Sequence, residues 1–177
     1  MKISEEGAHF AVTVFDSSQY HPIDFKDHTN LTSFIDAVDR KVNHTNGWTH
    51  TFDGLNAALN HMFNESNGMR SNVQRVLFFM TDGACWHDDG SGGNEAHLYG
   101  CTQDGFAQMR QNFQSRGIKI IGLGVTSGAN VDEILQFVNR QNYHYISNFA
   151  TLFDPGLPRK FRICDGVLII CIYDIKQ

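Results

Sequence analysis

The stretch Val76-Leu77-Phe78-Phe79-Met80-Thr81-Asp82-Gly83 decides the fold of this chain. Its unbroken apolar run is typical of a strand buried on both faces of a parallel sheet, and the Asp-Gly pair that follows favours a turn. Residues 8–15 and 119–125 form similar runs, and residues 143–146 form a shorter one. We therefore expect several parallel strands, with functional side chains on the turns where those strands end.

Helical periodicity separates these runs, because apolar residues recur three and four positions apart between them. Segment 21–25 contains Pro22, which cannot donate to a central ladder, and is expected to be an edge strand. The alternation predicts an α/β fold with three layers and a mostly parallel, doubly wound sheet that carries helices on both faces. The predicted helical stripes are Leu31, Phe34, Ile35 and Val38; Phe52, Leu55, Leu59 and Met62; Phe106, Met109 and Phe113; and Val131, Ile134, Leu135 and Val138.

The C-terminal segment 167–173, Val-Leu-Ile-Ile-Cys-Ile-Tyr, is the most continuously apolar run of the chain, and Asp174 follows it. Such a run is expected to be a central strand, covered on both faces. We expect residues 1–160 to form one domain, incomplete at its N-terminus. Residues 161–177 then either substitute for a missing first strand or begin a truncated following module.

Composition excludes some classes of function. The net charge of −5 offers no basic stripe for nucleic acid, and no apolar run reaches the roughly 18 residues of a membrane span. The first six residues are too polar for a signal peptide, whereas four cysteines and sequons at Asn30, Asn43 and Asn64 are typical of exported proteins. Cys85 and Cys101 could close the glycine-rich loop between them, but four cysteines permit three pairings and the sequence leaves the choice open.

The order of these elements resembles the von Willebrand factor type A domain over roughly residues 8–153. The resemblance is carried by segment 11–15, by Thr49-His50-Thr51, by the run that ends in Thr81-Asp82-Gly83, and by segment 117–125 with the helix after it. That family binds a divalent cation, usually magnesium, at a metal-ion-dependent adhesion site (MIDAS). The resemblance implies Thr49 and Asp82 as metal ligands and a protein partner whose acidic side chain completes the coordination of Mg²⁺.

The third part of the family's site, an Asp-x-Ser-x-Ser motif after the first strand, has no counterpart in this chain. It would lie upstream of residue 8, where only residues 1–7 stand. The sequence therefore predicts a degenerate site with weak cation binding or none. We hypothesise that segment 167–173 occupies the vacant central position of the sheet and brings Asp174 near Asp82, although the two serines would still be absent and Lys176 would add a cation.

Plainer interpretations remain for each residue. Asp82 could simply start a turn, and the hydroxyl of Thr49 or Thr51 could cap a helix. Asp104, Asp132 and Glu133 are expected to be helix-start charges. Trp48 and Trp86 could anchor a partner or pack in the protein. Two wider alternatives are weak. The spacing of His87, Asp88, Asp89, Glu95 and His97 does not match a zinc site. Gly122, Gly124 and Gly128 are expected to allow close packing, not to bind a dinucleotide.

The function that follows is non-enzymatic protein–protein binding, in the manner of extracellular adhesion or matrix modules. By resemblance the protein is extracellular and secreted, a disulfide-bonded glycoprotein, although the chain carries no signal peptide. One alternative is a metal-dependent hydrolase that uses Asp82 and the His87 loop. Another is a non-functional fragment that cannot fold alone.

Overall fold

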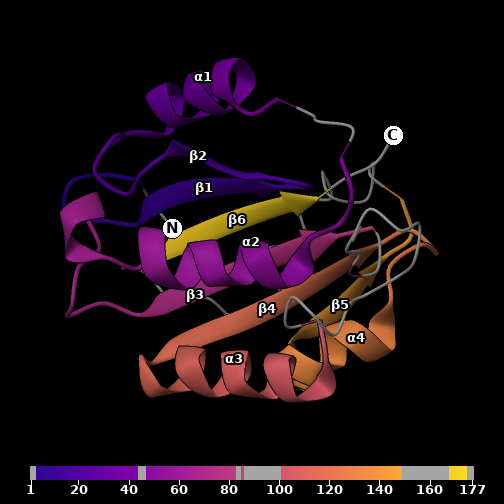
Figure 1. Ribbon diagram of the computed structural model, residues 1–177. Coiled ribbons are helices and arrows are strands. Elements are labelled where there is room, and N and C mark those ends of the chain that lie inside the picture. Colours follow the sequence, from indigo (N-terminus) through magenta and orange to yellow (C-terminus); the bar gives the residue numbers. More distant parts are fainter. Residues whose placement is uncertain (1–2, 44–46, 83–84, 86–100, 149–167, 175–177) are drawn as a thin grey trace.

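The fold is a six-stranded sheet with helices on both faces (Figure 1). The computed structural model describes residues 3–43, 47–82, 85, 101–148 and 168–174, the last segment by its backbone. The strands are β1 (His9–Phe15), β2 (Gln19–Ile23), β3 (Arg75–Thr81), β4 (Ile118–Val125), β5 (Tyr143–Ile146) and β6 (Leu168–Asp174). Their order across the sheet is β2-β1-β6-β3-β4-β5. Strand β2 alone runs antiparallel, and it lies at the edge as Pro22 predicts.

Strand β6 fills the centre of the sheet, between β1 and β3, and runs parallel to both. Cys171, for example, is in register with Val12 on one side and with Phe78 on the other. A doubly wound sheet has the order 3-2-1-4-5-6, in which the first strand is central. Here the last strand of the chain takes that place, as hypothesised from its continuous apolar run.

The helices cover the two faces in different ways. Helix α1 (Leu31–Lys41) lies over β1 and β2 at one edge, where Ala37 packs with Val12, Val14 and Ile23. The opposite face carries α2 (Thr51–Ala57), which continues as the π-helix η1 (Ala58–Met62), together with α3 (Gln103–Ser115) and α4 (Val131–Phe137) (Figure 1). Two short 3-10 helices, η2 (Glu65–Asn67) and η4 (Arg140–Asn142), complete the described elements.

The main core lies between the sheet and α2, η1, α3 and α4. Close approach is possible where glycine replaces a side chain: a Cβ on Gly54 of α2 would lie 2.6 Å from the Phe15 ring, and one on Gly122 of β4 would lie 2.9 Å from Ile134. The second contact confirms that Gly122 serves strand–helix packing. The largest fully buried side chains of this core are Phe15, Phe25, Phe79, Phe106, Phe113, Phe137, Leu55, Met62, Leu77 and Ile134.

Two of the predicted helical stripes are partly wrong. Leu31 and Ile35 are 56% and 47% exposed, because α1 covers only the edge of the sheet and buries Ala37 on its inner side. Val131 at the start of α4 is 38% exposed, whereas Ile134 and Phe137 are buried. Within the described ranges, no helix has the length and apolar character needed to cross a membrane.

Candidate functional site

The neighbouring strands β1, β6 and β3 have their carboxyl ends along the same edge of the sheet, and an aspartate lies at or directly after each of these ends. Asp16 directly follows β1, Asp174 is the last residue of β6, and Asp82 directly follows β3. The three strands are parallel, and the Cα of Asp174 is in register with Thr81, the residue before Asp82. Since adjacent strands lie about 4.8 Å apart, this edge collects acidic residues from three consecutive strands.

The loop that carries Thr49 is fastened to the same edge. The His50 amide donates to the Asp16 carbonyl at 3.2 Å, and the Trp48 amide donates to the Ser17 hydroxyl at 2.8 Å. Gly47 approaches so closely that a Cβ there would lie 2.6 Å from the Asp16 carboxylate. These contacts place Thr49 beside the end of β1, in the turn that leads into α2.

Thr49 is fully buried, yet its hydroxyl oxygen has no hydrogen-bond partner among the described residues. A buried hydroxyl without a partner is costly and calls for an explanation such as a water or an ion. The interpretation of Thr49 as a helix cap is not supported, because the N-cap of α2 is His50, which makes no side-chain capping bond. The Thr49 oxygen therefore remains available to a ligand.

Asp82 is positioned by its strand and by the loop after β4. It is partly exposed, and a Cβ on Gly128 would lie 2.4 Å from the Asp82 carbonyl oxygen. Only a residue without a side chain allows that approach, which explains Gly128 by packing. The structure thus brings Thr49 and Asp82 to the same edge of the sheet on separate loops.

The chemistry of this edge suits a hard cation. Hydroxyl and carboxylate oxygens are the ligands that Mg²⁺ accepts, and that ion usually keeps several waters and takes only one or two protein carboxylates. Three or more His, Cys, Asp or Glu side chains do not converge into a metal-binding group anywhere in the described part of the chain. A site here would therefore depend on the Thr49 hydroxyl and few carboxylates.

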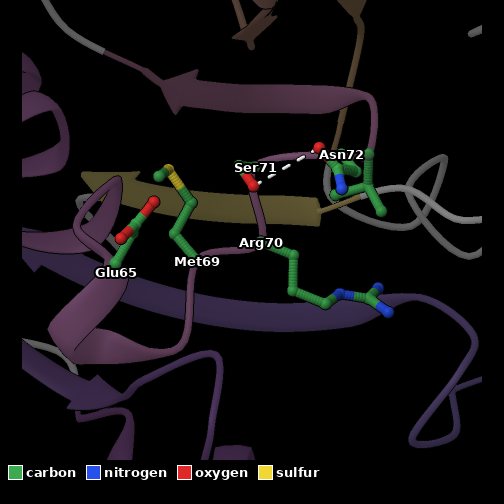
Figure 2. Close-up of a pocket in the computed structure, with 6 residues that line it drawn as sticks. Glu65, Met69, Arg70, Ser71 and Asn72 are labelled. Carbon is green, nitrogen blue, oxygen red and sulfur yellow. Dashed lines mark hydrogen bonds between the residues drawn. The ribbon is translucent and has the colours of Figure 1, made fainter.

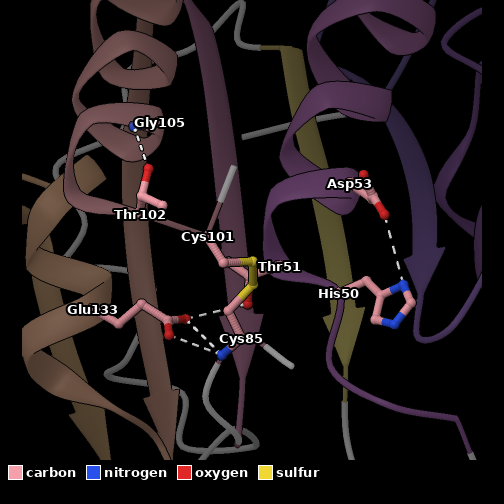
Figure 3. Close-up of a disulfide and its surroundings, with 8 residues drawn as sticks. All are labelled: His50, Thr51, Asp53, Cys85, Cys101, Thr102, Gly105 and Glu133. Carbon is pink, nitrogen blue, oxygen red and sulfur yellow. Dashed lines mark hydrogen bonds and ion pairs between the residues drawn. A yellow bond between two sulfur atoms is a disulfide. The ribbon is translucent and has the colours of Figure 1, made fainter. Parts of the chain in front are cut away.

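A disulfide and a buried carboxylate lie close to this edge (Figure 3). Cys85, three residues after Asp82, is bonded to Cys101, which directly precedes the Thr102 N-cap of α3. This is one of the pairings that the sequence left open. The Glu133 carboxylate accepts hydrogen bonds from the Cys85 amide at 2.8 and 3.0 Å and from the Thr51 hydroxyl at 3.3 Å.

Glu133 is only 9% exposed, and burial raises its pKa from 4.5 to about 7, against the smaller opposing effect of its hydrogen bonds to Cys85 and Thr51. The prediction of a simple helix-start charge is therefore incomplete for this residue. The sequence did carry a signal, since Asn130 and Glu133 have the spacing of a capping box. Here Asn130 caps the Glu133 amide at 3.2 Å, but the Glu133 side chain turns to Cys85 and Thr51 instead. Asp16 was missed for a different reason, as it looked like an ordinary strand end.

Other candidates lie elsewhere. The histidines and acids of the rejected zinc site, and Trp86, fall outside the described residues, while Trp48 is 46% exposed beside Thr49. A shallow hollow of about 540 Å³ lies before the start of β3, at the end of the sheet opposite Asp82 (Figure 2). Arg70 in that hollow donates to the carbonyls of Glu5 and Gly7, so it fastens the N-terminal segment. The hollow is lined by Glu65, Met69, Arg70, Ser71, Asn72 and Val73.

Known proteins resemble this chain in both sequence and fold. The model of the von Willebrand factor type A domain matches residues 1–154. The human collagen alpha-5(VI) chain is 27% identical over 168 residues, which cover 88% of this chain and 6% of the collagen chain. A structure of proximal thread matrix protein 1 from the mussel byssus superposes with a TM-score of 0.70 at 20% identity, over 93% of this chain and 37% of that one.

A second structure of the mussel protein, with a TM-score of 0.69 at 16% identity, covers 86% of this chain and 35% of that one, and is described as having a zinc-occupied MIDAS motif. The chain thus spans well under half the length of each of these relatives, which are named as a collagen and a matrix protein. The likeness to the mussel structures shows the fold. Because the family model matches most of its length, the chain belongs to the von Willebrand factor type A domain family.

Proposed function

We propose that this domain is a non-enzymatic protein-binding module of an extracellular matrix or adhesion protein, with a degenerate MIDAS. Its acting surface is the edge of the sheet that carries Thr49, Asp82 and the disulfide. The partner is a matrix or cell-surface protein that presents an acidic side chain. The collagen and byssus relatives support a matrix setting, and a disulfide supports an oxidising, extracellular one.

The observation that carries the proposal is the Thr49 hydroxyl, which is buried, unpartnered among the described residues, and held next to a row of strand-end aspartates. A cation bound by this oxygen and by Asp82 would satisfy the hydroxyl. It would leave coordination positions for water and for the partner's carboxylate. When bound, the ion would supply the positive charge that attracts that carboxylate.

Asp174 is the residue that we propose as a third donor. Its backbone position beside Thr81 corresponds to the end of the central strand, where the family carries the first aspartate of its motif. The site is poorer than a complete one, because Lys176 stands two residues after Asp174, where that motif carries its first serine. We therefore expect weak Mg²⁺ binding that the partner's acid strengthens.

The test is Mg²⁺ titration of the whole chain by calorimetry, followed by binding to immobilised extracellular matrix proteins in Mg²⁺ or in EDTA. Asp82→Ala is expected to abolish the Mg²⁺ dependence of both signals, because it removes a charged ligand from a site that has few of them. Asp104→Ala, which removes an exposed charge at the start of α3, is the matched control and should behave as wild type. Capture that is equal in Mg²⁺ and EDTA for the wild type would refute the metal-dependent mode.

No observation favours the hydrolase alternative, since His87 and its loop lie outside the described residues. The remaining alternative, a fragment that cannot fold, would require a sheet that lacks its central strand. Pairing of β6 with both neighbours supports a foldable chain. We propose the division into residues 1–160 and 161–177 on the same ground, with the second segment completing the sheet of the first.

A further inference from the structure

Glu133 is a buried carboxylate that the proposed binding chemistry does not use. It is 9% exposed, and its partners are an amide and a hydroxyl, with no cation among the described residues that contact it. Burying a carboxylate without a cation costs free energy that a glutamine or an apolar residue would save. Its hydrogen bonds offset part of this cost, and they join two segments of the proposed site.

Both of its contacts lie on segments that carry the proposed ligands. Thr51 is two residues after Thr49 and begins α2, and Cys85 is three residues after Asp82. Glu133 itself comes from α4, so its carboxylate joins the segment after Thr49 to the segment after Asp82 from a separate helix (Figure 3).

The anchor points are buried or tied to other elements. Thr51 is fully buried, Cys85 is 5% exposed and disulfide-bonded to the start of α3, and the Glu133 amide is held by Asn130. The two carboxylate oxygens act together, because Oε2 takes the shorter bond from the Cys85 amide and Oε1 is shared between that amide and Thr51. A fixed carboxylate between two fixed partners sets the separation of the loops that they belong to.

We propose that Glu133 is the positioning residue of the metal site: by bridging Thr51 and Cys85 it fixes the distance between the Thr49 and Asp82 loops. The inference rests on the proposed function. It matters because Mg²⁺ demands near-ideal octahedral geometry, so a site with few protein ligands depends strongly on their spacing. Residues that orient metal ligands typically change metal affinity about 10- to 100-fold when they are removed.

The experiment uses the whole chain, Mg²⁺ alone as the probe, and calorimetry at pH 8, where the carboxylate is charged. Glu133→Ala is expected to weaken Mg²⁺ binding about 10- to 100-fold. Glu133→Gln is expected to restore it to near the wild-type value, because its amide oxygen still accepts from Cys85 and its amide nitrogen can donate to Thr51. Asp132→Ala, which removes the exposed neighbouring charge from the same helix turn, should leave affinity unchanged.

A fourth variant separates positioning from stability. Met62 is fully buried in η1 and lies in the core, so Met62→Ala destabilises the fold without touching either loop. Its Mg²⁺ affinity should equal that of the wild type. Equal Mg²⁺ affinity in Glu133→Ala and wild type would overturn the inference while leaving the metal site intact, and equal losses in Glu133→Ala and Met62→Ala would overturn it as well.

Amide hydrogen exchange tests separately, without Mg²⁺, whether Glu133 holds the loop at Cys85. If the wild type bound no Mg²⁺, the proposed metal site would be refuted, whatever the exchange data show. In Glu133→Ala, the Cys85 amide loses its acceptor and should exchange about tenfold faster or more, relative to amides of β3 and β4. Glu133→Gln should keep the protection. Unchanged protection of Cys85 in Glu133→Ala would show that the carboxylate does not hold this loop.

Discussion

The pH dependence of stability offers a direct test of the buried state of Glu133. Burial raises the pKa of this carboxyl from 4.5 to about 7. The unfolded chain therefore releases the proton near pH 4.5, whereas the folded chain keeps it until about pH 7. Between these values the folded state binds more protons than the unfolded state, so the free energy of unfolding falls as the pH rises. At 1.36 kcal/mol for each pH unit of difference, the loss reaches about 3 kcal/mol above pH 7.

A histidine opposes this trend, so the wild-type curve alone is not diagnostic. Burial, and secondarily the nearby His61, lowers the pKa of His21 from 6.5 to about 4. The unfolded chain then binds the extra proton between pH 4 and 6.5, and stability from His21 rises with pH across that window. The two contributions have opposite signs over most of the same range, and the wild-type profile should be comparatively flat there.

The informative quantity is the difference between Glu133→Gln and wild type. Urea unfolding in EDTA at intervals from pH 4.5 to 8 should show the variant gaining on the wild type by about 3 kcal/mol up to pH 7, with a plateau above it. His21 contributes equally to both proteins and cancels. A difference that stays constant with pH would refute the reasoning, because it would mean that Glu133 titrates as it does in the unfolded chain.

Two further perturbations test the frame around the site. Replacing both Cys85 and Cys101 by serine removes a cross-link between residues 16 apart and should lower the free energy of unfolding by about 3 kcal/mol. Urea titration of the variant and the wild type, with and without reductant, measures this loss. No difference in stability under oxidising conditions would mean that the disulfide does not form. Cys171→Pro removes an N–H from a strand that is paired on both sides. The variant should therefore lose the cooperative thermal unfolding transition, which circular dichroism monitors. A transition like that of the wild type would place β6 outside the sheet.

Much of the fold could be predicted because its signals are local. Strands β1, β3 and β4 are mostly apolar runs, and Pro22 marks β2 as an edge strand. The position of β6 followed from the same reasoning, since a run apolar at every position has to be covered on both faces. The edge location of Thr49 and Asp82 came from family resemblance combined with the rule that parallel strands end together.

The errors concern what each element packs against, which no local pattern specifies. The apolar stripe of α1 correctly marks a helix, but periodicity does not reveal that the helix covers only the edge of the sheet and leaves Leu31 and Ile35 exposed. Glu133 shows the same limit. Its position three residues after Asn130 predicts a helix start, and its actual partners are 48 and 82 residues away along the chain.

In this molecule the same strand, β6, completes the sheet and brings Asp174 to the edge that carries the proposed site. Without β6, both β1 and β3 would present an unpaired row of backbone groups in the middle of the domain, a state that favours aggregation or pairing with another chain. Strand β6 satisfies both rows, and its parallel direction leaves only one end of it, the one with Asp174, at the edge where Asp16 and Asp82 stand. Had it paired in the antiparallel sense, Asp174 would lie at the opposite edge. The hydrogen bonds that close the sheet therefore also determine at which edge the chain carries Asp174.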